Sequence, residues 1–391
     1  MIRWNCEVCP ATVNSRNLHE MKILYLIFTF HTGGIEKQLI ELSRSVAEKN
    51  EVTLCVINHS YDEDLFRELS GKVRLILLQR KNGGEKLSFM WKFAGIVKRE
   101  KIDVIHAQEP TGVVFSMFAK IARPSVRIVE TIHDVGESKL YSKLQLTLAD
   151  RLCDHYIAIS KTVQNELLER GISLTRISLI YNGVNTDKFS AAGIKKETYS
   201  SVSVKGSIML GNVARFYPAK KGQDILVQAV EILKQRKIPV HCKFAGAVYR
   251  GQETEWQKLQ CYLQEHHLEQ DVEFVGNVSN VQEFLQNIDI FVLPSRFEGF
   301  GIALIEALSM GIPCVASRLD GPSEILTDTR LGLTFEPGSP FDLANQIEYM
   351  VRHYQQYDPD FLSRYVKEHF SLHALTENHM ALYQRICDRN K

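Results

Sequence analysis

Short apolar runs alternate with amphipathic stretches along the chain from Met21 onward. Helical periods separate most of these runs, which are rich in valine and isoleucine. In the first half of the chain they are KILYLIF, EVTLCVI, KVRLILL, DVIHAQ, VRIVETIH, HYIAIS and RISLIYN. Apolar runs flanked by helical periods are typical of parallel strands that are buried on both faces. The pattern therefore predicts a doubly wound α/β domain.

The alternation stops in a polar stretch and then starts again. Residues 185–206 are polar and predict an interdomain linker. The second series of apolar runs is IMLGNVAR, VHCKFAG, VEFVG, IDIFVLPS, IPCVAS and GLTFE. We therefore predict an α/β fold class with two Rossmann-like doubly wound domains facing each other across a cleft. Ligands are expected there, at the carboxyl ends of the strands.

The same pattern sets the expected boundaries. Residues 21–184 are expected to form the N-terminal domain, and residues 207–371 are expected to form the C-terminal domain. Residues 372–391 form a terminal helix that crosses back to the N-terminal domain. Residues 1–20 show neither strand nor helix periodicity and lack the apolar core of a signal peptide. We interpret them as a disordered leader, or Met21 as the biological start.

Composition narrows the class of protein. The 391 residues exceed what one hydrophobic core usually organises. A net charge of +1 argues against a nucleic-acid partner, which needs a basic excess. The eight cysteines are scattered, which is typical of a reduced cytoplasmic protein, and Cys6 and Cys9 are interpreted as incidental thiols. The apolar runs fall far short of the ~20 residues that a membrane span requires.

One segment places two carboxylates among apolar residues and glycines. SRFEGFGIALIEALSMGIPCVAS, residues 295–317, contains Glu298 in a loop and Glu306 on a helix that is expected to begin near Gly301. Gly299 and Gly301 allow a ligand to approach the backbone, and the N–H groups at the helix start favour an anion. Glu306 lies among apolar side chains, so its carboxylate should be hydrogen-bonded by ligand hydroxyls or protein donors. The alternative is that both are ordinary surface and cap carboxylates.

The segments EGFGIALIEA and GIPCVAS resemble the E-x7-E region of retaining glycosyltransferase family 4, which has the GT-B architecture. The resemblance implies that Glu298 holds hydroxyls of the donor sugar and that Glu306 binds the ribose of the nucleotide. It extends the expected donor site to the neighbouring backbone, which comprises Gly299, Phe300, Gly301 and Ile302.

Other segments carry the same resemblance. NVARFYPAKKGQD is similar to the family's diphosphate clamp and implies Arg215 with Lys221, directly before a glycine, or with Lys220. Guanidinium and ammonium groups suit a leaving diphosphate, whose charge grows in the transition state. HTGGIEKQLIEL resembles the family's glycine-rich loop through Gly33 and Gly34, which implies that this loop lies against the donor phosphate and the acceptor.

His133 at the end of a predicted strand matches the histidine beside the donor sugar, and His106 and Gln108 follow a neighbouring strand. The alternative for His133 is a structural histidine. In FAGAVYRGQETEW, Gly246 is kept but the acidic residue of the family's GDGP-type loop is missing. This departure leaves the nucleobase and the donor sugar open.

No metal or cofactor is expected. The sequence contains no HExxH, no paired CxxC, no Walker loop and no GxGxxG after a strand. The acidic groups at Asp62–Asp64 and Asp358–Asp360 precede predicted helices, so helix capping explains each of them. We predict metal-independent catalysis with a nucleotide-sugar as co-substrate.

The stretch 85–101 mixes aromatic with basic residues, as do peripheral proteins at membrane surfaces. The alternative is a helix that packs its apolar face on the sheet. Under the first interpretation, the protein is cytoplasmic and peripheral on the inner face of the membrane.

The resemblance, together with these patterns, implies a retaining hexosyltransferase whose N-terminal domain lies on the acceptor side and whose C-terminal domain binds the nucleotide-sugar donor. It would move a sugar from a nucleotide diphosphate-sugar to a glycan or lipid-linked glycan in cell-envelope polysaccharide synthesis. A nucleotide-sugar epimerase and a non-catalytic GT-B scaffold remain the alternatives.

Overall fold

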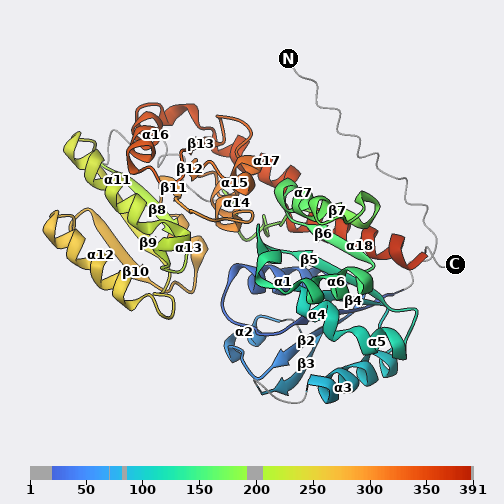
Figure 1. The fold of residues 1–391 in the computed structure, drawn as a ribbon. Helices are drawn as coiled ribbons and strands as arrows, with labels where there is room; N and C mark the ends of the chain where they lie inside the picture. The colour runs from blue at the N-terminus through green and yellow to red at the C-terminus, as the bar shows by residue number, and fades with distance from the viewer. Residues whose placement is uncertain (1–19, 70, 82–85, 192–205, 389–391) are drawn as a thin grey trace.

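The computed structural model describes residues 20–69, 71–81, 86–191 and 206–388. They form two α/β domains that are joined at one side (Figure 1). The predicted fold class is confirmed, because each domain is built on one parallel sheet. The predicted leader, residues 1–20 apart from Glu20, and most of the predicted linker lie outside the described residues, as do Cys6 and Cys9.

The N-terminal sheet has seven strands in the order β3-β2-β1-β4-β5-β6-β7. Because the order reverses between β1 and β4, a crevice opens outside the carboxyl ends of these strands. The strands are β1 (Lys22–Ile27), β2 (Glu51–Asn58), β3 (Val73–Arg80), β4 (Val104–Ala107), β5 (Arg127–Ile132), β6 (His155–Ala158) and β7 (Ile177–Leu179).

Helices cover both faces of this sheet, which explains why its strands are apolar throughout. The helices α1 and α2, with the terminal helix, share one hydrophobic cluster, and the remaining helices share another. They are α1 (Gly34–Val46), α2 (Glu63–Arg67), α3 (Lys86–Arg99), α4 (Pro110–Phe115), α5 (Met117–Ala122), α6 (Lys143–Leu152) and α7 (Lys161–Glu169). Short 3-10 turns lie at Glu137–Leu140 and Leu174–Arg176.

The C-terminal sheet has six strands in the order β10-β9-β8-β11-β12-β13. The order reverses between β8 and β11, so this domain has its own crevice. The strands are β8 (Ile208–Val213), β9 (Val240–Ala245), β10 (Val272–Gly276), β11 (Ile290–Leu293), β12 (Cys314–Ser317) and β13 (Gly332–Phe335). The helices are α10 (Pro218–Lys221), α11 (Gln223–Gln235), α12 (Glu253–Glu265), α13 (Val281–Leu285), α14 (Ile302–Ser309), α15 (Asp320–Ile325), α16 (Pro340–Arg352) and α17 (Pro359–His369).

The chain passes between the domains twice, and the two passages lie side by side. The Val184 N–H donates to Phe370 O, and the Leu372 N–H donates back to Val184 O, both at 2.8 Å. After this exchange α18 (Leu372–Asp388) packs against α1, whereas α17 packs against α14 of the C-terminal domain. The hinge therefore consists of two chain segments that are joined to each other by backbone hydrogen bonds.

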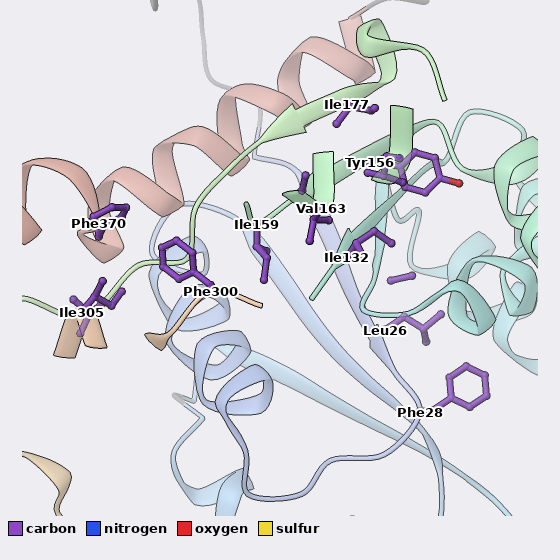
Figure 2. Packing of buried hydrophobic residues seen from close by; sticks show 14 of the residues in the cluster. Leu26, Phe28, Ile132, Tyr156, Ile159, Val163, Ile177, Phe300, Ile305 and Phe370 are labelled. Carbon is purple, nitrogen blue, oxygen red and sulfur yellow. The ribbon is translucent and has the colours of Figure 1, made fainter. Parts of the chain in front are cut away.

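A hydrophobic cluster continues across the hinge. Phe300, which follows β11, is buried and stacks on Tyr181 with ring centroids 5.6 Å apart. Phe370 meets Phe300 edge to face at the same centroid distance, and Figure 2 shows both rings beside Ile305. Glu324 of α15 adds polar contacts, because it accepts hydrogen bonds from Lys161 N and Tyr181 Oη, both at 2.8 Å. The two domains thus share a packed contact at their junction.

One of the two capping predictions was wrong. The Asp358 carboxylate does cap α17 by accepting from Asp360 N at 3.0 Å. Asp62 precedes α2 but makes no side-chain cap bond there. Its carboxylate accepts instead from Thr32 N and lies 2.9 Å from the His31 ring. A tertiary partner in the loop after β1 has displaced the local cap.

Candidate active site

The carboxylate of Glu298 is held at the carboxyl end of β11. Lys221 Nζ lies 2.9 Å from Glu298 Oε2, and the Ser295 hydroxyl donates to the same oxygen at 3.1 Å. Only 13% of the Glu298 side chain is exposed. An ion pair that is sheltered in this way fixes the carboxylate direction, so two of the predicted site residues are in direct contact.

Two loops that are far apart in sequence form this corner. Lys220 O accepts hydrogen bonds from the N–H groups of Arg296 and Phe297 at 2.8 and 3.2 Å. Arg296 also makes a bidentate pair with Asp224, with both distances 2.7 Å. The turn at α10 and the loop after β11 therefore move as one unit. This unit carries both lysines and Glu298.

The two adjacent lysines point to different domains. Whereas Lys221 pairs with Glu298 within its own domain, Lys220 Nζ lies 2.5 Å from Asp134 Oδ2 of the N-terminal domain. Asp134 follows β5 directly after His133. Lys220 therefore closes an ion pair between the domains, and Lys221 supplies positive charge beside Glu298.

Arg215 reaches the glycine-rich loop of the opposite domain. Its guanidinium carbon lies 4.8 Å from the centre of the Tyr249 ring, a cation–π distance. A Cβ on Gly33 would lie 3.7 Å from an Arg215 terminal nitrogen and 2.5 Å from a Glu36 carboxylate oxygen. Burial raises the pKa of Glu36, and the charge of Arg215 counteracts part of that rise. A positive group thus faces the loop that the sequence assigned to a phosphate.

His133 lies at a close contact between the two domains. A Cβ on Gly299 would be 2.4 Å from His133 O, so only glycine permits this approach of the loop. The His133 Nε2 is 2.9 Å from Gln108 Oε1, and the Gln108 amide nitrogen donates to His106 O at 3.4 Å. Desolvation lowers the pKa of His133 to about 4. The imidazole is therefore neutral at pH 7, with the Nε2 proton directed at Gln108.

The helix start after β11 presents backbone to the cleft. Gly301 precedes α14 with a φ of 108°, in the region that favours glycine, and provides no side-chain cap. Ile302 faces the other domain, since its Cδ1 would lie 3.7 Å from a Cβ on Gly34. The Phe300 side chain is buried in the core, so only its backbone can serve a ligand. The N–H groups at this helix start suit an anion.

Glu306 lines an open cleft between the domains. Burial raises the pKa of Glu306 to about 7, while Lys37 and Lys188 oppose that rise. The walls come from α1, the hinge, the loop before α13, and α14, and they include Lys37, Gln38, Glu41, Lys188, Asn280, Ile302 and Glu306. The cleft can hold an organic ligand that offers hydroxyls to Glu306.

The backbone geometry explains why residue 246 is a glycine. A Cβ there would be 2.0 Å from Ala214 O, and its φ is 142°. The loop after β9 can therefore lie against the residue that precedes Arg215. This geometry supports the position of Arg215.

The structure adds side chains that the sequence pattern did not single out. Asp134, Ser295 and Tyr249 contact predicted site residues, and Gln38 lies in the cleft wall. Asp134 had a sequence signal, because it follows a strand end beside His133. The other three gave none. Within the described ranges, no three His, Cys, Asp or Glu side chains are grouped so that they could hold a metal ion.

The fold and the cleft define a class of protein, the GT-B glycosyltransferases, in which two facing Rossmann-like domains enclose a nucleotide-sugar site. The chain belongs to glycosyltransferase family 4. The profile described as "Glycosyltransferase Family 4" matches residues 32–188, and "Glycosyl transferases group 1" matches residues 194–361. The protein is accordingly a glycosyltransferase that uses a nucleotide-sugar donor.

Individual relatives are distant but cover most of the chain. The "O-antigen biosynthesis glycosyltransferase WclY" of Escherichia coli is 24% identical and aligns with 84% of this chain and 88% of its own. The Bacillus anthracis "N-acetyl-alpha-D-glucosaminyl L-malate synthase" is 26% identical, over 66% of this chain and 68% of its own. The solved structure of Anabaena HepE in complex with UDP and glucose is 21% identical, with a TM-score of 0.79 over 93% of this chain and all of its own.

Proposed function

We propose that the protein is a retaining transferase that moves a hexose from a uridine diphosphate-sugar to a hydroxyl acceptor. The observation that carries the proposal is the convergence of Arg215, Lys221 and Glu298 with His133 at the facing strand ends. The two cations would bind the diphosphate, Glu298 and His133 the sugar, and Glu306 the ribose. The UDP bound to HepE supports the choice of base.

The arrangement favours substitution on one face of the sugar. The acceptor oxygen would form its bond to the anomeric carbon on the face that the diphosphate leaves. The carbon–oxygen bond to the diphosphate breaks, and the acceptor proton passes to the departing phosphate oxygen. Arg215 and Lys221 stabilise the charge that grows on that oxygen. Glu298 is already engaged by Lys221 and Ser295, which favours a role in orienting the sugar over one as nucleophile.

Ligand binding to the native state tests the donor site. UDP, GDP and ADP are added to the purified protein, first with EDTA and then with Mg²⁺, and the melting temperature is measured. Binding must raise stability by an amount set by concentration over affinity. We expect a shift with UDP in EDTA. A shift that requires Mg²⁺ would contradict metal independence, and no shift with any nucleotide would favour the scaffold alternative.

Product analysis tests the reaction itself. A UDP-hexose screen with a hydroxyl acceptor should release UDP and give a glycoside with the anomeric configuration of the donor, as seen by NMR. An epimerase would convert the UDP-sugar without any acceptor. Inversion at the anomeric carbon would contradict the retaining mechanism.

We further propose that the acceptor is a lipid-linked glycan of cell-envelope synthesis, reached from a membrane surface. Trp91 of α3 is 56% exposed and stacks on Phe118 of α5, with Ile121 62% exposed beside it. Helices α3 to α6 carry one acidic residue, Asp150, against seven lysines and arginines. Helices with an excess of basic residues and with exposed aromatic and aliphatic groups fit an anionic bilayer. No helix in the described ranges is long and apolar enough to span the membrane.

Vesicle co-sedimentation tests this surface. The wild type should bind vesicles that contain anionic phosphatidylglycerol and bind neutral phosphatidylcholine vesicles weakly. The paired substitution Trp91→Ser and Ile121→Ser should release it, whereas Phe341→Ser, at a residue 61% exposed on α16, should not. Equal binding by all three proteins would remove the membrane contact.

A further inference from the structure

The side chain of Gln38 is buried, and its amide nitrogen is unpaired among the described residues. Gln38 lies on α1 and is only 8% exposed. Its neighbours Leu39, Ile40 and Leu42 fill the hydrophobic core beneath α1. A glutamine amide offers two donors and one acceptor. Leaving such a group buried and unpaired costs on the order of 1–3 kcal/mol.

The position of Gln38 indicates what would satisfy it. Gln38 lines the cleft that contains Glu306, and it also lines a smaller cavity that contains Gln108 and His133. It therefore stands at the partition between the proposed ribose side and the proposed sugar side of the site. The charged groups in the cleft wall are Lys37 and Lys188 with the carboxyl groups of Glu41, Glu68 and Glu306. A side-chain N–H at this partition is suited to an oxygen acceptor of a ligand, such as a ribose hydroxyl or a phosphate oxygen.

We infer that Gln38 is a donor-binding residue of the N-terminal domain, which donates a hydrogen bond to the ribose–diphosphate part of the nucleotide-sugar. The inference rests on the proposed function, because it assigns a further contact within the same site. Arg215, Glu298 and Glu306 all belong to the C-terminal domain. Gln38 would bind the same ligand from the opposite wall, so nucleotide binding would hold the two domains together.

A ligand contact and a structural contact have opposite effects on stability. If Gln38 serves only a ligand, Gln38→Met removes an unpaired buried amide and leaves an apolar group of similar length. The ligand-free protein should then be at least as stable as the wild type. If an internal water or a protein group satisfies the amide, the same substitution should lower the melting temperature.

The experiment compares wild type, Gln38→Met, Gln38→Glu and the control Gln264→Met, which lies exposed on α12. Calorimetry measures the affinity for UDP and for uridine. We expect Gln38→Met to bind UDP about tenfold more weakly, the usual loss of one hydrogen bond to a charged group, without losing stability. Gln38→Glu should bind UDP more weakly still, because its charge repels the diphosphate. The control should match the wild type.

The uridine measurement divides the contact between its two possible acceptors. A loss with UDP alone assigns the bond to phosphate, and a loss with both ligands assigns it to ribose. Unchanged UDP affinity in Gln38→Met, or a lower melting temperature with unchanged affinity, would overturn the inference while the proposed function stands. Failure of the wild type to bind any nucleotide would instead overturn the proposed function and this contact with it.

Discussion

Lys221 Nζ lies 2.9 Å from Glu298 Oε2, while the adjacent Lys220 is directed into the other domain, 2.5 Å from Asp134. Two neighbouring lysines of one short helix thus have separate partners and separate consequences. Lys221 sits beside the carboxylate proposed to hold the donor sugar. Lys220 lies on the line along which the domains meet.

The two lysines provide a matched pair of substitutions. Lys221→Met should lower kcat by about 10²–10³-fold, because a preorganised charge on the leaving diphosphate is lost. Lys220→Met removes an ion pair in which both side chains are more than a third exposed, so its effect on kcat should be below tenfold. Steady-state kinetics of the two variants checks this order. Equal losses, or a larger loss in Lys220→Met, would assign the diphosphate to Lys220.

Glu298 should act on turnover more than on nucleotide affinity. Glu298→Gln keeps the length of the side chain but removes its charge, so the pairing with Lys221 weakens and the sugar hydroxyls lose a charged acceptor. We expect kcat to fall at least tenfold while UDP affinity changes less than threefold. Calorimetry with UDP alone and turnover with the UDP-sugar separate the two effects. Near-wild-type turnover would remove the role proposed for Glu298.

Gly299 should be essential for domain contact and not for folding. A Cβ there would lie 2.4 Å from His133 O, and this carbonyl is backbone that cannot move alone. Gly299→Ala should therefore push the loop off the N-terminal domain and reduce kcat more than tenfold, with the melting temperature lowered only slightly. Small-angle scattering should show a larger radius of gyration. A compact and fully active variant would contradict the closeness of this approach.

The Glu306 carboxyl predicts a pH effect on stability. Burial raises its pKa from 4.5 to about 7, so the unfolded chain loses this proton at lower pH than the folded protein does. The group's contribution to stability is therefore fully present below pH 4.5 and is lost as the pH rises to about 7. Glu306→Gln cannot ionise. Relative to the wild type it should gain stability between pH 5 and pH 8, by up to roughly 3 kcal/mol.

Denaturant unfolding of both proteins at pH 5, 6, 7 and 8 measures this difference. Glu298→Gln is the control carboxyl, since Glu298 is paired with Lys221. A constant difference between Glu306→Gln and the wild type over the four pH values would show that Glu306 is ionised normally in the folded protein.

The strand pattern was sufficient to predict the fold. Each apolar run named in both halves of the sequence contains a strand of the described structure, because parallel strands covered on both faces must be apolar throughout. Periodicity also located the start of α14 next to Gly301. The terminal helix, expected from 372 onward, is formed at Leu372–Asp388.

Contacts between segments that are far apart in the chain could not be predicted from the sequence. Lys220 and Asp134 are 86 residues apart, and nothing local in either segment indicates that they meet. Asp62 has the local pattern of a helix cap. Its carboxylate instead contacts the His31 ring and the Thr32 N–H group of the loop after β1, both at 2.9 Å. Phe300 belongs to a loop that contains two glycines, yet its ring is buried in the core, where it packs against Tyr181 and Phe370. Gln38 lies on a helix whose sequence does not indicate that this polar side chain is buried.

The paired passages at Val184 and Phe370 restrict how the enzyme can open. A single covalent connection would let one domain rotate in any direction. Two connections that are hydrogen-bonded to each other restrict this rotation to one axis. Gly183 tightens this joint, because a Cβ there would be 2.7 Å from Ser371 O. The cleft can then widen by rotation about one line, while sliding and twisting would break these hydrogen bonds. The same rotation of the domains would then admit each donor molecule and release each nucleotide.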